Sequence, residues 1–234
     1  ADKEKGIDFN ISQIGSFKFS HYNPKINEVE IKKPDVLSPE QLKRFLNLEV
    51  FQITPTYKDR KAVELYFDFC VFMFHSFLAP CDVIKLKYKD ITKEKTILIK
   101  RKKTHKTVEI PINPIMEDII SKYKGKTKNG YVFPVMDDEK EKQYKTKDFT
   151  FKKFRERVNV WLKLIGEDLE TDYKLYAYVF RHTAITVALD NGIPISYVAM
   201  VAGTSIEMIQ EHYYNGNNTR NTEKLQFAFI SASM

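Results

Sequence analysis

The chain has 234 residues, 43% of them hydrophobic, so it can bury one substantial core but is too short for several large domains. Its net charge of +7 favours a polyanionic partner, nucleic acid before membrane. Two cysteines exclude a disulfide framework or a cysteine zinc site, and no apolar run is long enough to span a bilayer. Without a signal peptide at the start, the sequence predicts a cytoplasmic protein.

The first part of the chain is polar and has no hydrophobic period. Asn23-Pro24 and Lys32-Lys33-Pro34 interrupt regular structure towards its end. We therefore predict that residues 1–34 are an N-terminal lead and linker. Residues 35–234 are then expected to form one domain.

Two helices are predicted at the start of this domain. Ser38 precedes Pro39 and stands three residues before Gln41, which is the pattern of a capping box at the beginning of a helix. A longer helix is predicted from about residue 59 to 77. It is apolar on nearly all sides, which indicates that it lies inside the domain. Its six aromatic residues are interpreted as core rather than as a platform for stacking bases.

A β-hairpin with a basic tip is predicted next. Residues 97–99 and 108–110 alternate like short strands. Between them the chain reads Lys100-Arg101-Lys102-Lys103-Thr104-His105-Lys106. From residue 85 to 106 it has ten Lys or Arg against two acids. Such a run is either a solvated charged face or a set of contacts to phosphates.

The stretch from residue 178 to 214 carries the chemistry. Arg181 offers five donors in a planar fork that suits a phosphate, and the Tyr213 hydroxyl could attack phosphorus and hold it covalently. Between them, Gly192 suits the left-handed residue after a helix and Pro194 suits a first helical position. The two groups are therefore expected on successive short helices that could converge on one phosphate.

Three features in this order resemble the tyrosine recombinase (phage integrase) family. They are the run Arg181-His182-Thr183, the helix break, and the ending from Gly203-Thr204-Ser205 to Glu211-His212-Tyr213. The ending is similar to a variant in which Gly-Thr-Ser replaces the commoner Gly-His. An ordinary basic helical domain is the alternative. The resemblance implies that residues 35–234 are a recombinase catalytic domain, mainly α with a small antiparallel β-sheet (α+β).

The resemblance also implies roles for individual residues. Tyr213 would be the nucleophile that forms a 3′-phosphotyrosyl bond, and Arg181 would stabilise the charge on the phosphate. Lys103 matches the lysine of the family's hairpin, which gives a proton to the leaving oxygen. The other cations predicted to contact DNA are Lys100, Arg101, Lys102, Lys106 and His182.

The chain departs from the family pattern at three positions. The first family arginine stands three residues before an acidic residue; here the acid matches Asp82 and the arginine position holds Ala79. Tyr178 and Thr204 stand where the family has histidines, and Tyr178 could still donate through its hydroxyl. Losing one donor to the transition state typically costs on the order of a hundred- to thousandfold in rate.

The favoured interpretation is a site-specific DNA recombinase (integrase) of a phage or mobile element. Its expected partners are double-stranded DNA and further copies of itself in a synaptic complex; without DNA the chain could be a monomer. No carboxylate cluster has the spacing of a metal site, so neither a metal nor another cofactor is expected. The alternatives are a recombinase-like protein that binds DNA but cuts it poorly or not at all, and a type IB topoisomerase-like swivelase that acts as a monomer.

Overall fold

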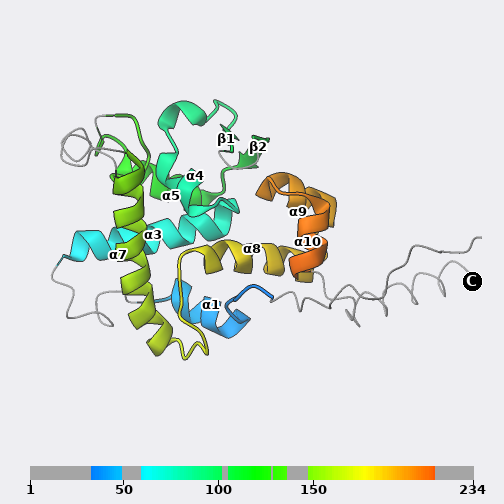
Figure 1. Ribbon diagram of the computed structural model, residues 1–234. Helices are drawn as coiled ribbons and strands as arrows, with labels where there is room; N and C mark the ends of the chain where they lie inside the picture. The colour runs from blue at the N-terminus through cyan, green and yellow to red at the C-terminus, as the bar shows by residue number, and fades with distance from the viewer. Residues whose placement is uncertain (1–32, 49–58, 102–104, 128, 136–146, 214–234) are drawn as a thin grey trace, which may run out of the picture. The chain divides into compact units, whose positions relative to one another are not determined.

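Helix α3 (Arg60–Ser76) is the element around which the described part of the chain packs. The computed structural model describes residues 33–48, 59–101, 105–127, 129–135 and 147–213, all within one unit, Lys32–Met234. In it, α3 contacts α4 (Pro80–Lys85), α5 (Pro114–Tyr123), α7 (Lys147–Asp168) and α8 (Tyr178–Asp190), as Figure 1 shows. Nine residues of α3 are buried. Its predicted position and its place in the core are therefore confirmed.

The predicted capping box begins helix α1 (Pro39–Leu46). The Ser38 hydroxyl accepts a hydrogen bond from the Gln41 N–H at 3.2 Å, and the Gln41 side chain accepts one from the Ser38 N–H at 3.0 Å. On the buried face, the Phe45 ring lies 5.2 Å from that of Phe67 on α3 and 4.5 Å from that of Phe180 on α8. Helix α1 therefore packs against both the central helix and the helix that carries Arg181.

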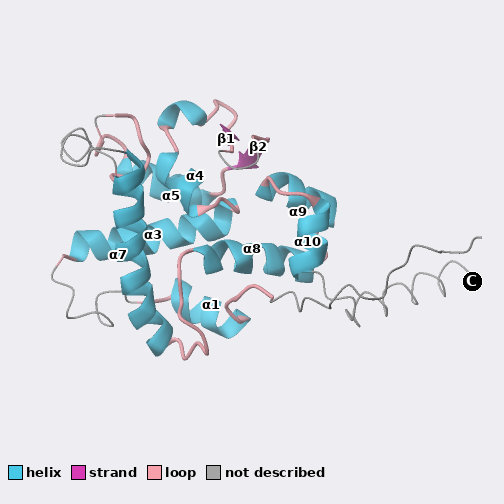
Figure 2. Cartoon of the chain, viewed as in Figure 1, coloured by secondary structure: helices cyan, strands magenta, loops and turns pink. Residues whose placement is uncertain are grey.

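The predicted hairpin is the one sheet in the described residues, and Figure 2 shows it beside helix α9 (Ile195–Ala202). Its strands are β1 (Thr96–Lys100) and β2 (Thr107–Pro111), paired antiparallel so that Ile97 faces Ile110. Both of these side chains are buried, whereas Leu98 is 47% exposed. Strand β2 also contacts α9. Residues 102–104 lie outside the described residues, so the roles given to Lys102 and Lys103 stay predictions.

Helix α7 crosses α3 and contributes the largest buried side chain. The Trp161 ring is fully buried, 6.3 Å from Phe45 and 6.1 Å from Tyr66. Apolar residues repeat at helical spacing from Phe151 to Ile165, and the sequence predicts that Gly166 stops this helix; that prediction is wrong, because α7 continues to Asp168. A Cβ at Gly166 would lie 2.9 Å from the Thr171 hydroxyl oxygen and 3.0 Å from the Leu175 Cβ. Glycine stands there because the chain after the helix folds back closely against it.

The last described elements are three successive helices. After α8 the chain turns through Gly192 (φ +79°), as predicted, and α9 follows. Pro194 is the residue before α9 rather than its first helical position. Gly203 (φ +59°) ends α9, and α10 (Ile206–Tyr213) begins shortly after it. None of the helices in the described ranges is long and apolar enough to cross a membrane.

Candidate active site

Arg181 lies on the buried side of α8 and is 4% exposed. Its Nη2 donates a hydrogen bond to the Ala202 carbonyl at the end of α9 at 2.8 Å, and its Nη1 donates to the Phe77 carbonyl after α3. Both partners are neutral, so the positive charge stays available to an anion. Burial, followed by the nearby charge of Arg101, lowers the pKa of Arg181 below its usual value. A negative charge beside the two guanidinium groups would act against this lowering of the pKa.

Arg101 lies beside Arg181 and contacts the same backbone carbonyl. It follows β1 at the start of the basic run, yet it is only 4% exposed. Its Nη1 donates to the Gly203 carbonyl at 3.0 Å and also to the Ala202 carbonyl, the oxygen that Arg181 contacts. Two guanidinium groups from segments far apart in the sequence therefore meet on one backbone oxygen.

Asp82 at the start of α4 holds Arg101 in place. The Arg101 Nε donates to its carboxylate at 2.9 Å, and both side chains are almost fully buried. Asp82 stands three residues after Ala79. Ala79 is buried, and it occupies the position that the family resemblance assigns to the first arginine. Arg101, held by Asp82, is thus a second fixed guanidinium next to Arg181. Sequence reasoning assigned Arg101 to the DNA-contacting surface; its burial gives it a different place.

Tyr213, the last residue of α10, has its hydroxyl hydrogen-bonded to Nδ1 of His182. The two ring centroids are 5.6 Å apart, and the His182 ring also lies 4.9 Å from that of Tyr178, one helical turn earlier on α8. Burial raises the pKa of the Tyr213 hydroxyl to about 12, and the positive charge of Arg181 acts in the opposite direction. The phenol is therefore protonated at neutral pH and lies in the field of Arg181.

His182 is uncharged in this environment. Burial, and then the charges of Arg181 and His212, lower the pKa of its ring to about 4. A neutral imidazole has one nitrogen with a proton and one that accepts. The protonated phenol is a donor, so Nδ1 is the acceptor and the ring proton is assigned to Nε2. Sequence reasoning placed His182 on DNA; the structure places it against the predicted nucleophile.

The neutral His182 predicts a pH dependence of stability. Its pKa of about 4 lies below the usual value of about 6.5, so between these values the unfolded chain binds more protons. Its contribution is complete above the higher value and is lost as the pH falls towards the lower one. We expect the unfolding free energy of wild type to drop relative to His182→Asn by about 2 kcal/mol between about pH 7 and about pH 4.5. Urea unfolding of both proteins measures this; parallel pH profiles would contradict it.

Thr204 connects the hairpin to the turn between α9 and α10. Its carbonyl accepts a hydrogen bond from Lys106 Nζ at 3.0 Å, and its N–H donates to the Ala199 carbonyl. Lys106 remains exposed, as does Lys100 at the end of β1. Both are therefore accessible to a partner, while Lys106 also links the basic hairpin to the site.

Gly203 lies where no side chain fits. A Cβ there would overlap the Arg101 Cδ and lie 2.7 Å from a Val108 methyl carbon, and φ is +59°. We expect Gly203→Ala to lower the unfolding free energy by about 3 kcal/mol, since it combines a left-handed backbone with overpacking. Gly130→Ala is the matched control, because φ is +70° there and nothing lies within 4 Å. It should cost only about 1 kcal/mol. Equal losses in urea unfolding would contradict a close approach at Gly203.

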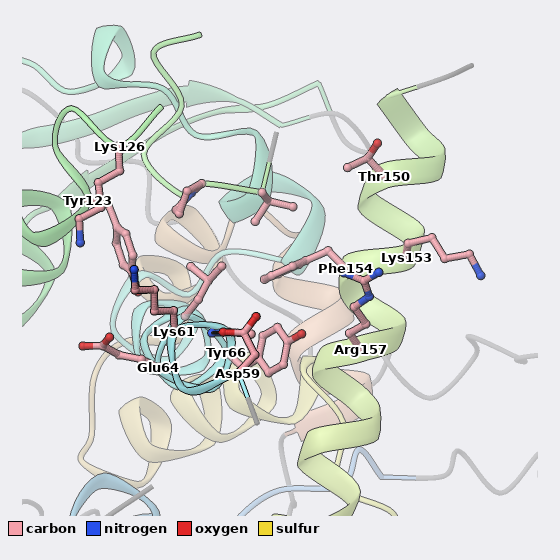
Figure 3. Close-up of a pocket in the computed structure, with 14 residues that line it drawn as sticks. Asp59, Lys61, Glu64, Tyr66, Tyr123, Lys126, Thr150, Lys153, Phe154 and Arg157 are labelled. Carbon is pink, nitrogen blue, oxygen red and sulfur yellow. Dashed lines mark hydrogen bonds between the residues drawn. The ribbon is translucent and has the colours of Figure 1, made fainter. Parts of the chain in front are cut away.

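A hollow lies elsewhere in the described part of the chain, between α3, α5 and α7 (Figure 3). It has a volume of about 520 Å³ and is lined by charges of both signs, with Lys61, Lys126 and Arg157 beside Asp59 and Glu64. None of its described lining residues belongs to the cluster around Tyr213. Within the ranges that the structure describes, no group of three or more His, Cys, Asp or Glu could hold a metal ion.

Comparison with known proteins identifies the family. A model of the phage integrase family matches residues 36–220, which is most of the chain. The chain belongs to this family. The resemblance drawn from the Arg181 to Tyr213 stretch is therefore confirmed. No curated protein sequence matches the chain.

Solved structures of recombinases share the fold of this chain. XerA recombinase is 16% identical with a TM-score of 0.53, over 84% of this chain and 66% of XerA. XerH recombinase in a pre-cleavage complex with its difH substrate is 18% identical with a TM-score of 0.59, over 83% and 55%. The Tn1549 transposon integrase with transposon right end DNA is 17% identical with a TM-score of 0.58, over 94% and 71%. This chain thus spans less than two thirds of the XerA and XerH chains. The predicted α+β fold is confirmed.

Proposed function

We propose that this protein is a site-specific DNA recombinase that cuts and rejoins DNA through a 3′-phosphotyrosyl bond to Tyr213. The observation that carries the proposal is the meeting of Arg101 and Arg181 on the Ala202 carbonyl, with the Tyr213 hydroxyl bonded to the residue after Arg181. Two fixed cations beside a protonated phenol are suited to an in-line attack on a phosphodiester.

In this mechanism the two arginines stabilise the charge that develops on the non-bridging oxygens. A guanidinium has five N–H donors, more than the described carbonyl and carboxylate bonds of either arginine use. The Tyr213 oxygen forms a bond to phosphorus as the bond from phosphorus to the 5′ oxygen breaks. A 5′ hydroxyl of another strand later attacks the phosphotyrosine. The energy of the broken bond is kept, so the exchange needs no ATP.

Arg101 bears on the choice between an active and an impaired enzyme. Ala79 alone favours the alternative, a recombinase-like protein that binds DNA without cutting it efficiently, since one arginine would then be missing. The buried Arg101–Asp82 pair supports activity, because it supplies a second guanidinium from the hairpin. We therefore propose that Arg101 acts as the second transition-state cation.

Double-stranded DNA is the proposed partner, and copies of the chain are proposed to assemble on it. XerH and the Tn1549 integrase were solved on their DNA substrates, and lambda integrase as a dimer on a core site. Residues 35–234 would be the catalytic domain and residues 1–34 a linker. A DNA partner also makes the cytoplasm the proposed location.

A nicked suicide substrate tests this function. When Tyr213 attacks near a nick, the short strand with the 5′ hydroxyl diffuses away and the adduct is trapped. Because the target sequence is unknown, the probe is a pool of nicked duplexes with randomised sequence around the nick. We expect a covalent protein–DNA band that survives denaturation and is absent with Tyr213→Phe. A protein that binds the pool but forms no such band would favour the binding-only alternative.

Lys103 is proposed to give the proton to the leaving 5′ oxygen. We expect Lys103→Ala to keep DNA affinity within a few fold but to slow cleavage about 10²- to 10⁴-fold. A substrate with sulfur at the 5′ bridging position has a leaving group that needs no proton, so it should restore the rate. Failure of that rescue would contradict the acid role. Lys100→Ala serves as the control, because loss of one phosphate contact should weaken binding and lower the salt slope by about one unit.

A further inference from the structure

We propose that His182 is the general base that removes the proton from Tyr213, and that the scissile phosphate switches this base on. The inference deepens the proposed function and rests on it. It gives His182 a role in the chemistry in place of the DNA contact expected from the sequence. Three observations on the described residues carry it, together with the phosphate site proposed above.

The first observation is the contact itself. Nδ1 of His182 is hydrogen-bonded to the Tyr213 hydroxyl, the atom that would attack phosphorus. A general base must lie within hydrogen-bond reach of the proton that it removes, so the geometry is already satisfied without DNA.

The second observation is that the imidazole is held in position. Its ring contacts those of Tyr178 and Tyr213, with centroids 4.9 and 5.6 Å away and interplanar angles of 47° and 41°. Tyr178 is on the same face of α8 one turn earlier, and Tyr213 comes from α10. Helices α8 and α10 therefore fix both partners of the hydrogen bond.

The third observation concerns charge around the ring. The titratable and charged groups that act on His182 and Tyr213 are Arg181 and Tyr178 on α8, His212 on α10 and Tyr176 before α8. Arg181 in turn is influenced by Arg101 and Asp82. The nearest fixed charge is thus positive, and it opposes a second positive charge on the imidazole. In the free protein His182 is a weak base, with a pKa near 4.

The fourth step rests on the proposed function, in which the same cations bind the phosphate. A phosphodiester bound between Arg101 and Arg181 adds one negative charge and offsets the repulsion that keeps the imidazole neutral. Its basicity then rises when the target of the nucleophile is in place. Without substrate, Tyr213 keeps its proton and stays unreactive, which guards against attack on the wrong phosphate.

The proton and electron balance follows from these positions. As the Tyr213 oxygen bonds to phosphorus, its proton moves to Nδ1 of His182 and the imidazole becomes imidazolium. The electron pair of the broken bond goes to the 5′ oxygen, which takes a proton from the acid of the hairpin. In the rejoining step the imidazolium returns the proton to the Tyr213 oxygen as that oxygen leaves phosphorus. No oxidant, metal or further co-reactant is needed.

His182→Asn separates a base from a structural contact. The Asn side-chain oxygen can take the place of Nδ1 and accept the phenol hydrogen bond, but it cannot hold the proton. Cleavage is measured in single turnover on a sequence recovered from the suicide pool, made with the 5′ sulfur so that the acid step drops out. The cleavage rate of wild type should rise with pH and then level off once His182 is neutral. His182→Asn should be about 10²- to 10⁴-fold slower and keep rising with pH, since Tyr213 must then lose its proton to solvent.

The outcomes are distinguishable. Absence of an adduct with wild type overturns the proposed function and this inference together. An adduct that His182→Asn forms within a few fold of the wild-type rate, with the same levelling, overturns the inference alone. Melting curves and DNA affinity of the variant are measured first, and a variant that has lost its fold is replaced by the following measurement on intact protein.

Nitrogen NMR of His182 needs neither an active variant nor a target sequence. In wild type the chemical shift of Nδ1 should be that of a nitrogen that accepts a hydrogen bond. This chemical shift should change in Tyr213→Phe, which lacks the hydrogen bond. Millimolar inorganic phosphate, standing in for the scissile group, should raise the pH at which His182 titrates by about one unit or more. Sulfate serves as an anion of similar shape, and chloride is the ionic-strength control. An Nδ1 signal indifferent to Tyr213→Phe, or a titration indifferent to phosphate, overturns the inference.

Discussion

Tyr213→Phe should form no covalent adduct with the suicide substrate, a loss of at least about 10⁴-fold because the nucleophilic oxygen is removed. DNA affinity should stay within a few fold, since the aromatic ring that packs beside His182 is kept. The hydrogen bond to His182 is lost with the oxygen, at a cost of about 1 kcal/mol in unfolding free energy. The measurement is a denaturing gel for the adduct and a native gel for binding.

The matched control is Tyr214→Phe, which removes the neighbouring phenol. Tyr214 lies outside the described residues, and Tyr213 is the residue that the family resemblance assigns as the nucleophile. Tyr214→Phe should cleave at the wild-type rate. If Tyr214→Phe abolished the adduct and Tyr213→Phe did not, the assignment of the nucleophile would be wrong.

Arg101→Ala is expected to have the second largest effect, and it should act on both stability and cleavage. Removing the guanidinium leaves the buried Asp82 carboxylate without its ion pair, which typically costs about 3–5 kcal/mol. It also removes one of the two cations proposed for the transition state, which should slow cleavage about 10²- to 10³-fold. Urea unfolding and single-turnover cleavage measure the two effects separately.

A second substitution separates these effects. In Asp82→Asn/Arg101→Ala both members of the ion pair are neutral, so much of the lost stability should return while cleavage stays slow. Lys100→Ala is the control for charge alone, because it removes an exposed cation from the adjacent position. A stable double variant that cleaves at the wild-type rate would show that Arg101 has only a structural role. Arg101 would then not replace the family arginine that is absent at position 79.

The fold could be predicted where local chemistry decides it. The capping box at Ser38 begins a helix because it satisfies backbone donors within four residues, and the hairpin strands follow from a period of two. The end of α7 could not be predicted from Gly166. That glycine makes room for Thr171 and Leu175, where the chain after the helix packs back against it. A glycine looks the same in sequence whether it ends a helix or makes room for a neighbour.

The sequence predicts Arg181 and Tyr213 as site residues from their places around the helix break. The structure brings both to one region, where the charge of Arg181 acts on the Tyr213 hydroxyl. Their roles in the chemistry stay predictions. The inward position of Arg101 depends on Asp82, 19 residues away in sequence, and on Ala202, 101 residues away. Nothing in the basic run distinguishes Arg101 from its neighbouring lysines except its planar fork, which suits a buried pair with a carboxylate. The contact of His182 with Tyr213 likewise joins α8 to α10, and no sequence pattern within either helix predicts it.

The most direct test of the central claim is to locate the covalent bond. The trapped adduct is digested with nuclease and trypsin, and the peptide of residues 182–220 is fragmented by mass spectrometry. The nucleotide should be found on Tyr213, joined through its 3′ phosphate, with a 5′ hydroxyl on the released strand that polynucleotide kinase can label. A nucleotide on any other residue, a 5′ phosphate linkage, or no adduct from a protein that binds the DNA would contradict the account.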